Sequence, residues 1–398
     1  MALPRLWLAS LPDDIVKDIL TWLPPKPLVR FRCVLRCWKS NIADPEFIER
    51  HLIINKAKSL SLSENNNAYL LCNTPPVPFL HWPRVGELCT VICNSDSSFT
   101  KIIRLKVPSH ESTLRFYNGI FCFVGDMPAF SLRRKRQAIP VTPPVRNSAI
   151  YLGNPSIRKH KRLPTVLVND RFENSSYGLA FLTSQNNDLK LLVFGRFNRE
   201  QLRAQVYTLR TNSWSWVELP VEPLDEFVGP ISRISPSPLA LHFIATTSQV
   251  YEFILCFDVD NEQFWEIKLP HNYSNGLSLK FKQLVVFKGS LALIAFGQDE
   301  AELVEVCRIW VMSEYGLADS WTPTLSVPLS GVADFLGCTG SGELVIMKSG
   351  NQVFSFDPEN QNENDLGIQN LTPLEILPPL KPRFYTANLI ESLVLLDE

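Results

Sequence analysis

Pairs of an aliphatic residue followed by proline recur along most of the chain at a nearly constant interval. The pairs are Val107-Pro108, Leu163-Pro164, Leu219-Pro220, Leu269-Pro270, Val327-Pro328 and Leu377-Pro378. Successive prolines are 56, 56, 50, 58 and 50 residues apart. A period of about fifty residues is typical of repeat architectures, in which each repeat is one supersecondary unit. The chain is therefore expected to fold as a series of similar units.

The residues between these pairs follow a strand pattern. Short β-branched and aromatic runs, such as residues 190–194, 253–257 and 344–347, alternate with turn residues. Each unit reads as a strand, a polar turn, an aromatic or charged strand and then the aliphatic-proline pair. This pattern predicts a β-propeller-like domain of about six blades, with four strands per blade and a last strand that closes the ring.

Three units predict hairpins with Asx or Ser at the turn, at residues 150–164, 206–220 and 256–270. Aromatic side chains dominate β cores, and the tryptophans of this region are expected in the cores of the blades rather than in a ligand cage. They are Trp214, Trp216, Trp265, Trp310 and Trp321.

The first fifty-odd residues have a helical pattern instead. A helix is expected over residues 10–23, with Ser10 as its cap, Pro12 in its first turn and an end at Pro24-Pro25. Its apolar stripe consists of Ile15, Val16, Ile19, Leu20 and Leu23. The helical spacing resumes at Pro27 and continues to Trp38, and Asp44-Pro45 is expected to cap a last helix.

A three-helix unit of roughly 45 residues is close to the size below which a domain seldom stabilises itself. Its apolar stripe must therefore be buried either on a partner protein or on the rest of this chain, and periodicity does not decide between them. The expected fold is mainly β with a small all-α N-terminal module. The expected domains are residues 1–55 and residues 56–398.

The helical residues resemble the F-box, particularly its plant form. The resemblance is carried by Leu11-Pro12, Ile15-Val16, Ile19-Leu20, Leu23-Pro24, Lys26-Pro27-Leu28, Arg30-Phe31-Arg32-Cys33-Val34, Trp38-Lys39-Ser40, Ile42 and Asp44-Pro45. It implies docking to the Skp-family adaptor of a cullin ubiquitin ligase. The residues implied at that interface are Leu11, Pro12, Ile15, Val16, Ile19, Leu20, Leu23, Pro24, Leu28, Phe31, Val34 and Trp38.

The strand region resembles the F-box-associated domain of the plant kelch-related group, type 1. The matching segments are Asn154-Pro155-Ser156 with Arg158-Lys159, Tyr177 to Phe181, Leu209 to Trp214, Ile309 to Met312 with Tyr315-Gly316 and Ser320-Trp321, and Glu391-Ser392-Leu393. The resemblance implies a substrate-recognition subunit of an SCF-type ligase that captures a target protein and promotes its ubiquitin-dependent degradation. The alternative is a non-degradative propeller scaffold, and an enzyme is a second rival.

Composition narrows the remaining classes of function. Lys plus Arg (39) nearly cancels Asp plus Glu (40), so nucleic acid is not an expected partner. No apolar run approaches the roughly 18 residues of a spanning helix, and residues 1–11 lack a signal-peptide pattern, so an intracellular protein of the cytoplasm or nucleus without a membrane partner is expected. No nucleotide-binding, hydrolase or zinc-protease motif occurs, so neither catalysis nor a cofactor is expected. The Cys33/Cys37 and Cys89/Cys93 pairs lack a second pair at zinc spacing, and core packing is expected for them.

One dense basic run, Arg133, Arg134, Lys135 and Arg136, lies in a proline-containing stretch and predicts an exposed loop. Three interpretations remain open for it: a solvated loop, a nuclear import signal, or a contact with an acidic target or nucleic acid.

Overall fold

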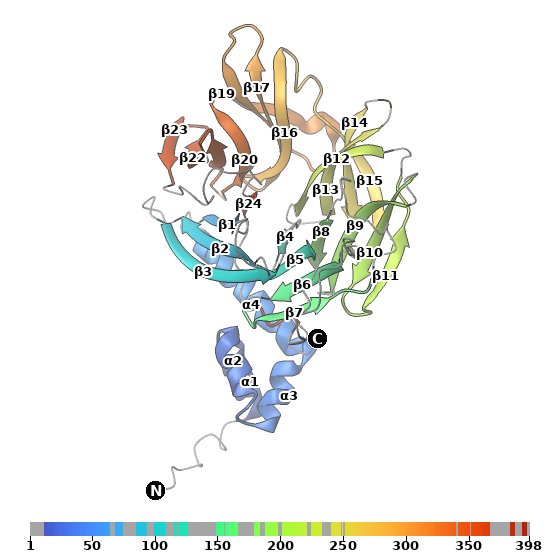
Figure 1. Cartoon of the computed structure of the whole chain (residues 1–398), viewed down its shortest axis with the longest axis vertical. Coiled ribbons are helices and arrows are strands. Elements are labelled where there is room, and N and C mark those ends of the chain that lie inside the picture. Colours follow the sequence, from blue (N-terminus) through green and yellow to red (C-terminus); the bar gives the residue numbers. More distant parts are fainter. Residues whose placement is uncertain are drawn as a thin grey trace, which may run out of the picture.

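The structure is a computed structural model. It describes residues 12–63, 68–74, 85–93, 99–108, 115–117, 119–125, 149–154, 156–165, 179–183, 188–197, 201–220, 224–232, 240–247, 249, 251–339, 341–350, 352–366, 383–386 and 392–395. Four helices come first and strands follow, so the expected mainly β fold with a small α-helical N-terminal module is confirmed. The helices lie beside the ring of sheets, next to β4–β7 and β1–β3 (Figure 1).

The helices are α1 (Asp13–Thr21), α2 (Pro25–Phe31), α3 (Arg36–Ala43) and α4 (Pro45–Ser63). Pro12 occupies the N-cap of α1 and no side chain caps that end, while Ser10 lies outside the described residues. The acidic first turn, Asp13 and Asp14, stabilises the positive end of the helix instead.

The continuous helical spacing expected from Pro27 to Trp38 is wrong, because a turn separates α2 from α3. The Cys33 and Val34 amides bond three residues back, to the Arg30 and Phe31 carbonyls, which tightens the chain out of the α-helix. Leu35 is then extended, with φ −136° and ψ 144°. Apolar spacing alone does not reveal a break of this length.

The expected cap of the last helix is present. The Asp44 carboxylate accepts a hydrogen bond from the Glu46 amide at 3.1 Å, directly before α4. α4 then continues to Ser63, so the boundary expected at residue 55 lies inside a helix.

The described strands form six four-stranded antiparallel sheets in consecutive order. The first comprises β1 (Ala68–Thr74), β2 (Val85–Cys93), β3 (Phe99–Pro108) and the late strand β24 (Arg383–Thr386). The second and third are β4 (Arg115–Tyr117), β5 (Ile120–Gly125), β6 (Ala149–Asn154) and β7 (Lys159–Arg162), then β8 (Leu179–Thr183), β9 (Leu189–Phe197), β10 (Gln201–Thr208) and β11 (Ser213–Val217). The fourth is β12 (Leu224–Ser232), β13 (Ala240–Thr247), β14 (Glu252–Asp258) and β15 (Gln263–Lys268). The fifth and sixth are β16 (Leu277–Phe287), β17 (Ser290–Asp299), β18 (Glu305–Met312) and β19 (Trp321–Pro328), then β20 (Val332–Cys338), β21 (Leu344–Lys348), β22 (Gln352–Asp357) and β23 (Asn362–Asp365).

The first strand of each sheet lies toward the centre, where β4, β8, β12, β16, β20 and β24 contact one another in sequence (Figure 1). β24 pairs antiparallel with β1, with Leu70 opposite Thr386 and Asn73 opposite Arg383. A strand from late in the sequence thus completes the first sheet, as the propeller interpretation expected.

The recurring aliphatic-proline pairs lie at the end of the outermost strand. Val107-Pro108 and Val327-Pro328 close β3 and β19, the pairs at 163–164 and 269–270 directly follow β7 and β15, and the pair at 219–220 follows β11 after one residue. The pair at 377–378 lies outside the described residues. Proline is tolerated there because an edge strand has no partner for the missing amide hydrogen. The aliphatic residues are mostly buried, and Leu163, Leu269 and Val327 are 3%, 8% and 4% exposed.

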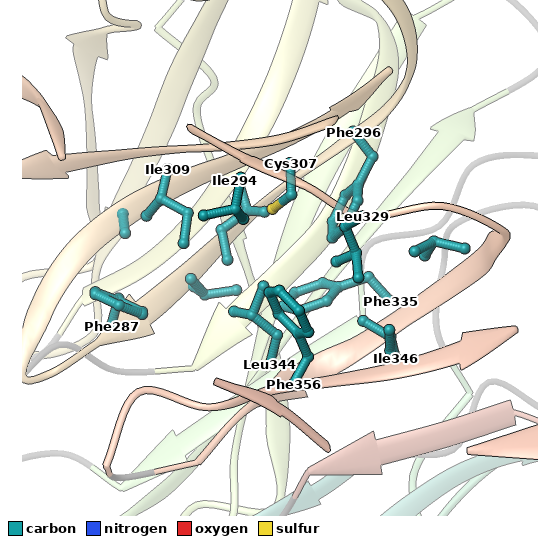
Figure 2. Close-up of a cluster of buried hydrophobic side chains, with 14 residues drawn as sticks. Phe287, Ile294, Phe296, Cys307, Ile309, Leu329, Phe335, Leu344, Ile346 and Phe356 are labelled. Carbon is teal, nitrogen blue, oxygen red and sulfur yellow. The ribbon is translucent and has the colours of Figure 1, made fainter. Parts of the chain in front are cut away.

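The hydrophobic cores lie between neighbouring sheets. Figure 2 shows the cluster formed by β16–β19 and β20–β23, in which the Phe296 and Phe335 ring centroids are 5.5 Å apart. An ion pair joins another two sheets: the Lys282 ammonium of β16 bonds the Glu252 carboxylate of β14 and, at 2.8 Å, the Tyr273 hydroxyl.

Two expectations about side chains fail in part. Trp321 is 7% exposed, and Trp214, Trp265 and Trp310 are partly buried, but Trp216 of the outer strand β11 is 45% exposed, with its ring beside the Arg203 guanidinium. Cys33 and Cys37 are exposed rather than packed in a core: Cys33 lies at the turn between α2 and α3, and Cys37 lies in the first turn of α3. The side chains of Cys89 and Cys93 are outside the described part.

Candidate functional site

Helix α1 carries two apolar stripes on different faces. Val16 and Leu20 face inward, at 8% and 3% exposure, and pack against a core from the other helices: Leu28, Ile42 and Phe47. Ile15, Ile19 and Trp22 follow one another at four- and three-residue steps on another face and are 45%, 51% and 62% exposed. Helix α1 therefore carries more apolar side chains than its packing against the other helices buries.

The side of α1 nearest α4 is fixed by polar contacts. The Lys17 ammonium pairs with Asp44 at 3.2 Å, and the Arg50 guanidinium pairs with Asp18 at 2.8 Å. The hydrogen bond from Lys17, and then that from the Glu46 amide, lower the pKa of Asp44. These contacts add to the packing of Val16 and Leu20, which leaves the second stripe of α1 facing solvent.

His51 of α4 contacts the segment that directly follows α1. Its side chain is fully buried, stacks on Phe47 and donates from Nε2 to the Leu23 carbonyl at 2.9 Å. Nδ1 then accepts from the Asn55 amide at 3.1 Å, which requires the neutral ring. Burial lowers the pKa of His51 and so favours that neutral form.

A second exposed apolar surface lies at the turn between α2 and α3, where Val34 and Leu35 are 60% and 44% exposed. With Ile53 of α4 at 51%, the helical module exposes six large apolar side chains, as many as the described part of the ring, which is several times longer. Five of these side chains lie on α1 and at the turn between α2 and α3, and this concentration of exposed apolar surface marks an interaction site there.

The twelve residues implied at the adaptor interface occupy three environments. Pro12, Ile15, Ile19, Pro24 and Val34 are exposed, Leu23, Phe31 and Trp38 are partly buried, and Val16, Leu20 and Leu28 lie in the core of the module. Leu11 is outside the described residues. In this chain the core residues support the exposed stripe from beneath. The adaptor role of the set stays a prediction.

Sequence reasoning missed Trp22 and Leu35. A signal for Trp22 was present, because it follows Ile15 and Ile19 at the same helical spacing. For Leu35 the signal was misleading, since it was assigned to a helix that the structure breaks at this position.

On the ring, the basic run at residues 133–136 lies outside the described residues, so its three interpretations stay open. Among the residues that are described, no group of three or more His, Cys, Asp or Glu side chains is placed to hold a metal ion. In that same part of the chain, no helix combines the length and apolar character needed to cross a membrane.

The protein thus combines a small helical module, which exposes an apolar stripe, with a propeller-like ring of four-stranded sheets. Residues 8–50 match the F-box domain model, and residues 92–385 match the F-box associated beta propeller domain model. The chain therefore belongs to the family of F-box proteins with an F-box associated β-propeller domain.

Three similar proteins, all from Arabidopsis thaliana, carry names of the same class. F-box protein At3g07870 is 25% identical over 80% of this chain and 73% of its own length. F-box only protein 8 is 25% identical over 71% and 88%, and F-box/kelch-repeat protein At3g23880 is 22% identical over 82% and 81%. In general terms these domains are those of a substrate-recognition subunit of an SCF ligase, and the F-box implies a Skp-family adaptor as partner.

Proposed function

We propose that this protein is a non-catalytic substrate-recognition subunit of an SCF-type cullin ubiquitin ligase. Its F-box binds a Skp-family adaptor, its propeller binds a target protein, and the complex promotes ubiquitin-dependent degradation of that target. The observation that carries the proposal is the outward stripe of α1, formed by Ile15, Ile19 and Trp22. The assignment to the kelch-related group, type 1, rests on the sequence motifs of the ring.

The reaction then requires no catalytic residue from this chain. A target bound to the ring is held near activated ubiquitin on the partner complex, which replaces a bimolecular encounter by a reaction at high effective concentration. The chain selects the target protein and positions it. Its location in the cytoplasm, the nucleus or both is part of the same proposal.

The exposed stripe supports adaptor binding because a partner can bury these side chains, with a gain in free energy, while the helical module stays folded. Ile15 and Ile19 are about half exposed in the isolated chain, and their helix is already held in place by the packing of Val16 and Leu20 in the core of the module. A preorganised apolar surface loses little conformational entropy on binding.

The proposal is tested by gel filtration of the purified chain with a purified Skp-family adaptor. Wild-type protein should co-elute with the adaptor, and the double variant Ile15→Asp/Ile19→Asp should elute separately while its circular dichroism is unchanged. Ile53→Asp is the matched control, since Ile53 is as exposed as Ile19 but lies on α4. Co-elution of a folded double variant would contradict the assignment of this surface.

The non-degradative scaffold shares the docking step, so a second assay must separate the two functions. Reconstituted ligase should attach ubiquitin to a protein captured by the ring when the wild-type chain is present. A scaffold would bring the same protein into the complex without modification.

A further inference from the structure

The hydrophobic core of the F-box helices contains a residue from the other end of the sequence. Leu393 is fully buried in the cluster formed by Val16, Leu20, Leu28, Ile42 and Phe47. Ile157, from the turn between β6 and β7, is packed against the same cluster. The helices therefore complete their core with residues that belong to the ring.

Hydrogen bonds hold the segment that carries Leu393. The side-chain nitrogen of Asn154 (Nδ2), at the end of β6, donates to the Ser392 carbonyl at 2.9 Å and to the Val394 carbonyl at 2.7 Å. Its oxygen accepts from the Ser156 amide at 2.9 Å. Asn154 is 1% exposed, so these bonds are shielded from water and costly to lose.

The segment has a second apolar anchor on its opposite side. Leu395 is 4% exposed and packs in the core shared by β4–β7 and β8–β11, beside Val394. Its φ of 70° is an unusual backbone conformation for a leucine, which persists only where surrounding contacts enforce it. Residues 392–395 thus insert one leucine into the helices and one into the ring.

Two motifs that the sequence comparison singled out meet here. Asn154-Pro155-Ser156 and Glu391-Ser392-Leu393 are separated by more than 230 residues, yet Asn154 and Ser156 both bond to the segment at Ser392. The Ser392 hydroxyl also accepts from the Val394 amide at 3.0 Å, which shapes the segment for this position. The described residues of the two motifs are parts of one contact.

We propose that residues 392–395 are a clasp that locks the F-box helices onto the ring in one orientation. The proposal rests on the proposed function for its biological meaning, because a fixed orientation keeps a ring-bound target at a defined place relative to the adaptor. A rigid connection gives a higher effective concentration at that place than a flexible linker of equal length.

The clasp is tested in the full-length chain without adaptor, by hydrogen exchange with mass spectrometry. Leu393→Ala removes the anchor in the helices, and Asn154→Asp keeps the side-chain size but replaces the two donors by a carboxylate facing two carbonyl oxygens. Each variant should exchange the amides of α1, α4 and residues 392–395 at least about ten times faster than wild type, because local opening becomes easier. The amides of β12–β19 should keep their wild-type rates.

Two further variants keep the outcome interpretable. Leu303→Ala makes the same substitution at a leucine that is 70% exposed in the connection between β17 and β18, and it should leave exchange in the helices unchanged. Leu393→Met conserves volume and should restore most of the protection. Wild-type rates in the helices of both Leu393→Ala and Asn154→Asp, or equally faster exchange in every sheet, would overturn the clasp.

Orientation is measured separately, with genetically encoded nitroxide labels at positions 37 and 317, which are both exposed. Pulsed dipolar spectroscopy should give a narrow distance distribution in wild type and a broad one in the two clasp variants. A broad distribution in wild type would refute the fixed orientation. If instead the wild-type chain fails to bind adaptor while these results hold, the proposed function is wrong and the clasp stands.

Discussion

Truncating the outward stripe of α1 gives a quantitative prediction for adaptor binding. Burial of a whole isoleucine side chain is worth about 1.5–3 kcal/mol, and Ile15 and Ile19 have 45% and 51% of their surface available for a partner. The double variant Ile15→Ala/Ile19→Ala should therefore weaken binding by about 1.5–3 kcal/mol, which corresponds to about a ten- to hundredfold higher Kd.

Isothermal titration calorimetry with a purified Skp-family adaptor measures this change. Thermal unfolding should stay close to wild type, because exposed substitutions usually alter stability by less than about 0.5 kcal/mol. Leu20→Ala is unsuitable for the same purpose: it removes a side chain that is 3% exposed and should cost about 2–5 kcal/mol of folding free energy in the module. An unchanged Kd, or an equal loss in the exposed control Ile53→Ala, would show that Ile15 and Ile19 do not form the adaptor surface.

Three other measurements test separate parts of the structure. Burial lowers the pKa of His51 in the folded chain, so below pH 6.5 the unfolded chain binds more protons and the free energy of unfolding of the module should fall. His51→Gln should flatten this pH dependence, measured by chemical denaturation at several pH values. The same pH dependence in wild type and variant would contradict the prediction. Iodoacetamide should label Cys33 and Cys37 in the native protein but not Cys256, which is buried and whose pKa is raised by burial. Mass spectrometry monitors the labelling, and labelling of Cys256 as fast as that of Cys33 would contradict its buried position. Changing residues 133–136 to Ser should slow capture of an acidic target in a salt-dependent way in stopped-flow binding, whereas altered cellular location with normal binding indicates nuclear import, and no change in either indicates a solvated loop.

Features with a local physical cause could be predicted from the sequence. The aliphatic-proline period located the ends of the outer strands because proline is restricted to sheet edges. The cap at Asp44 followed from the same kind of rule, since its carboxylate and the next proline determine where a helix begins.

Features that depend on contacts far apart in sequence could not be predicted. Periodicity showed that α1 is apolar on a broad face, but not that Val16 and Leu20 point inward while Ile15 and Ile19 point outward, because that depends on where α4 lies. The question whether the helices bury their apolar surface on a partner or on this chain has two answers. Leu393 completes their core, and the outer stripe remains exposed.

In the proposed function, one chain joins an adaptor to a target through two separate surfaces. Quantitative affinity purification of wild type and of Ile15→Asp/Ile19→Asp, with the proteasome inhibited, measures both surfaces in one experiment. The variant should lose adaptor and cullin together, while proteins bound to the ring are retained at equal or higher yield. Retention of the adaptor by the variant, or loss of adaptor and ring-bound proteins together from a folded variant, would contradict it.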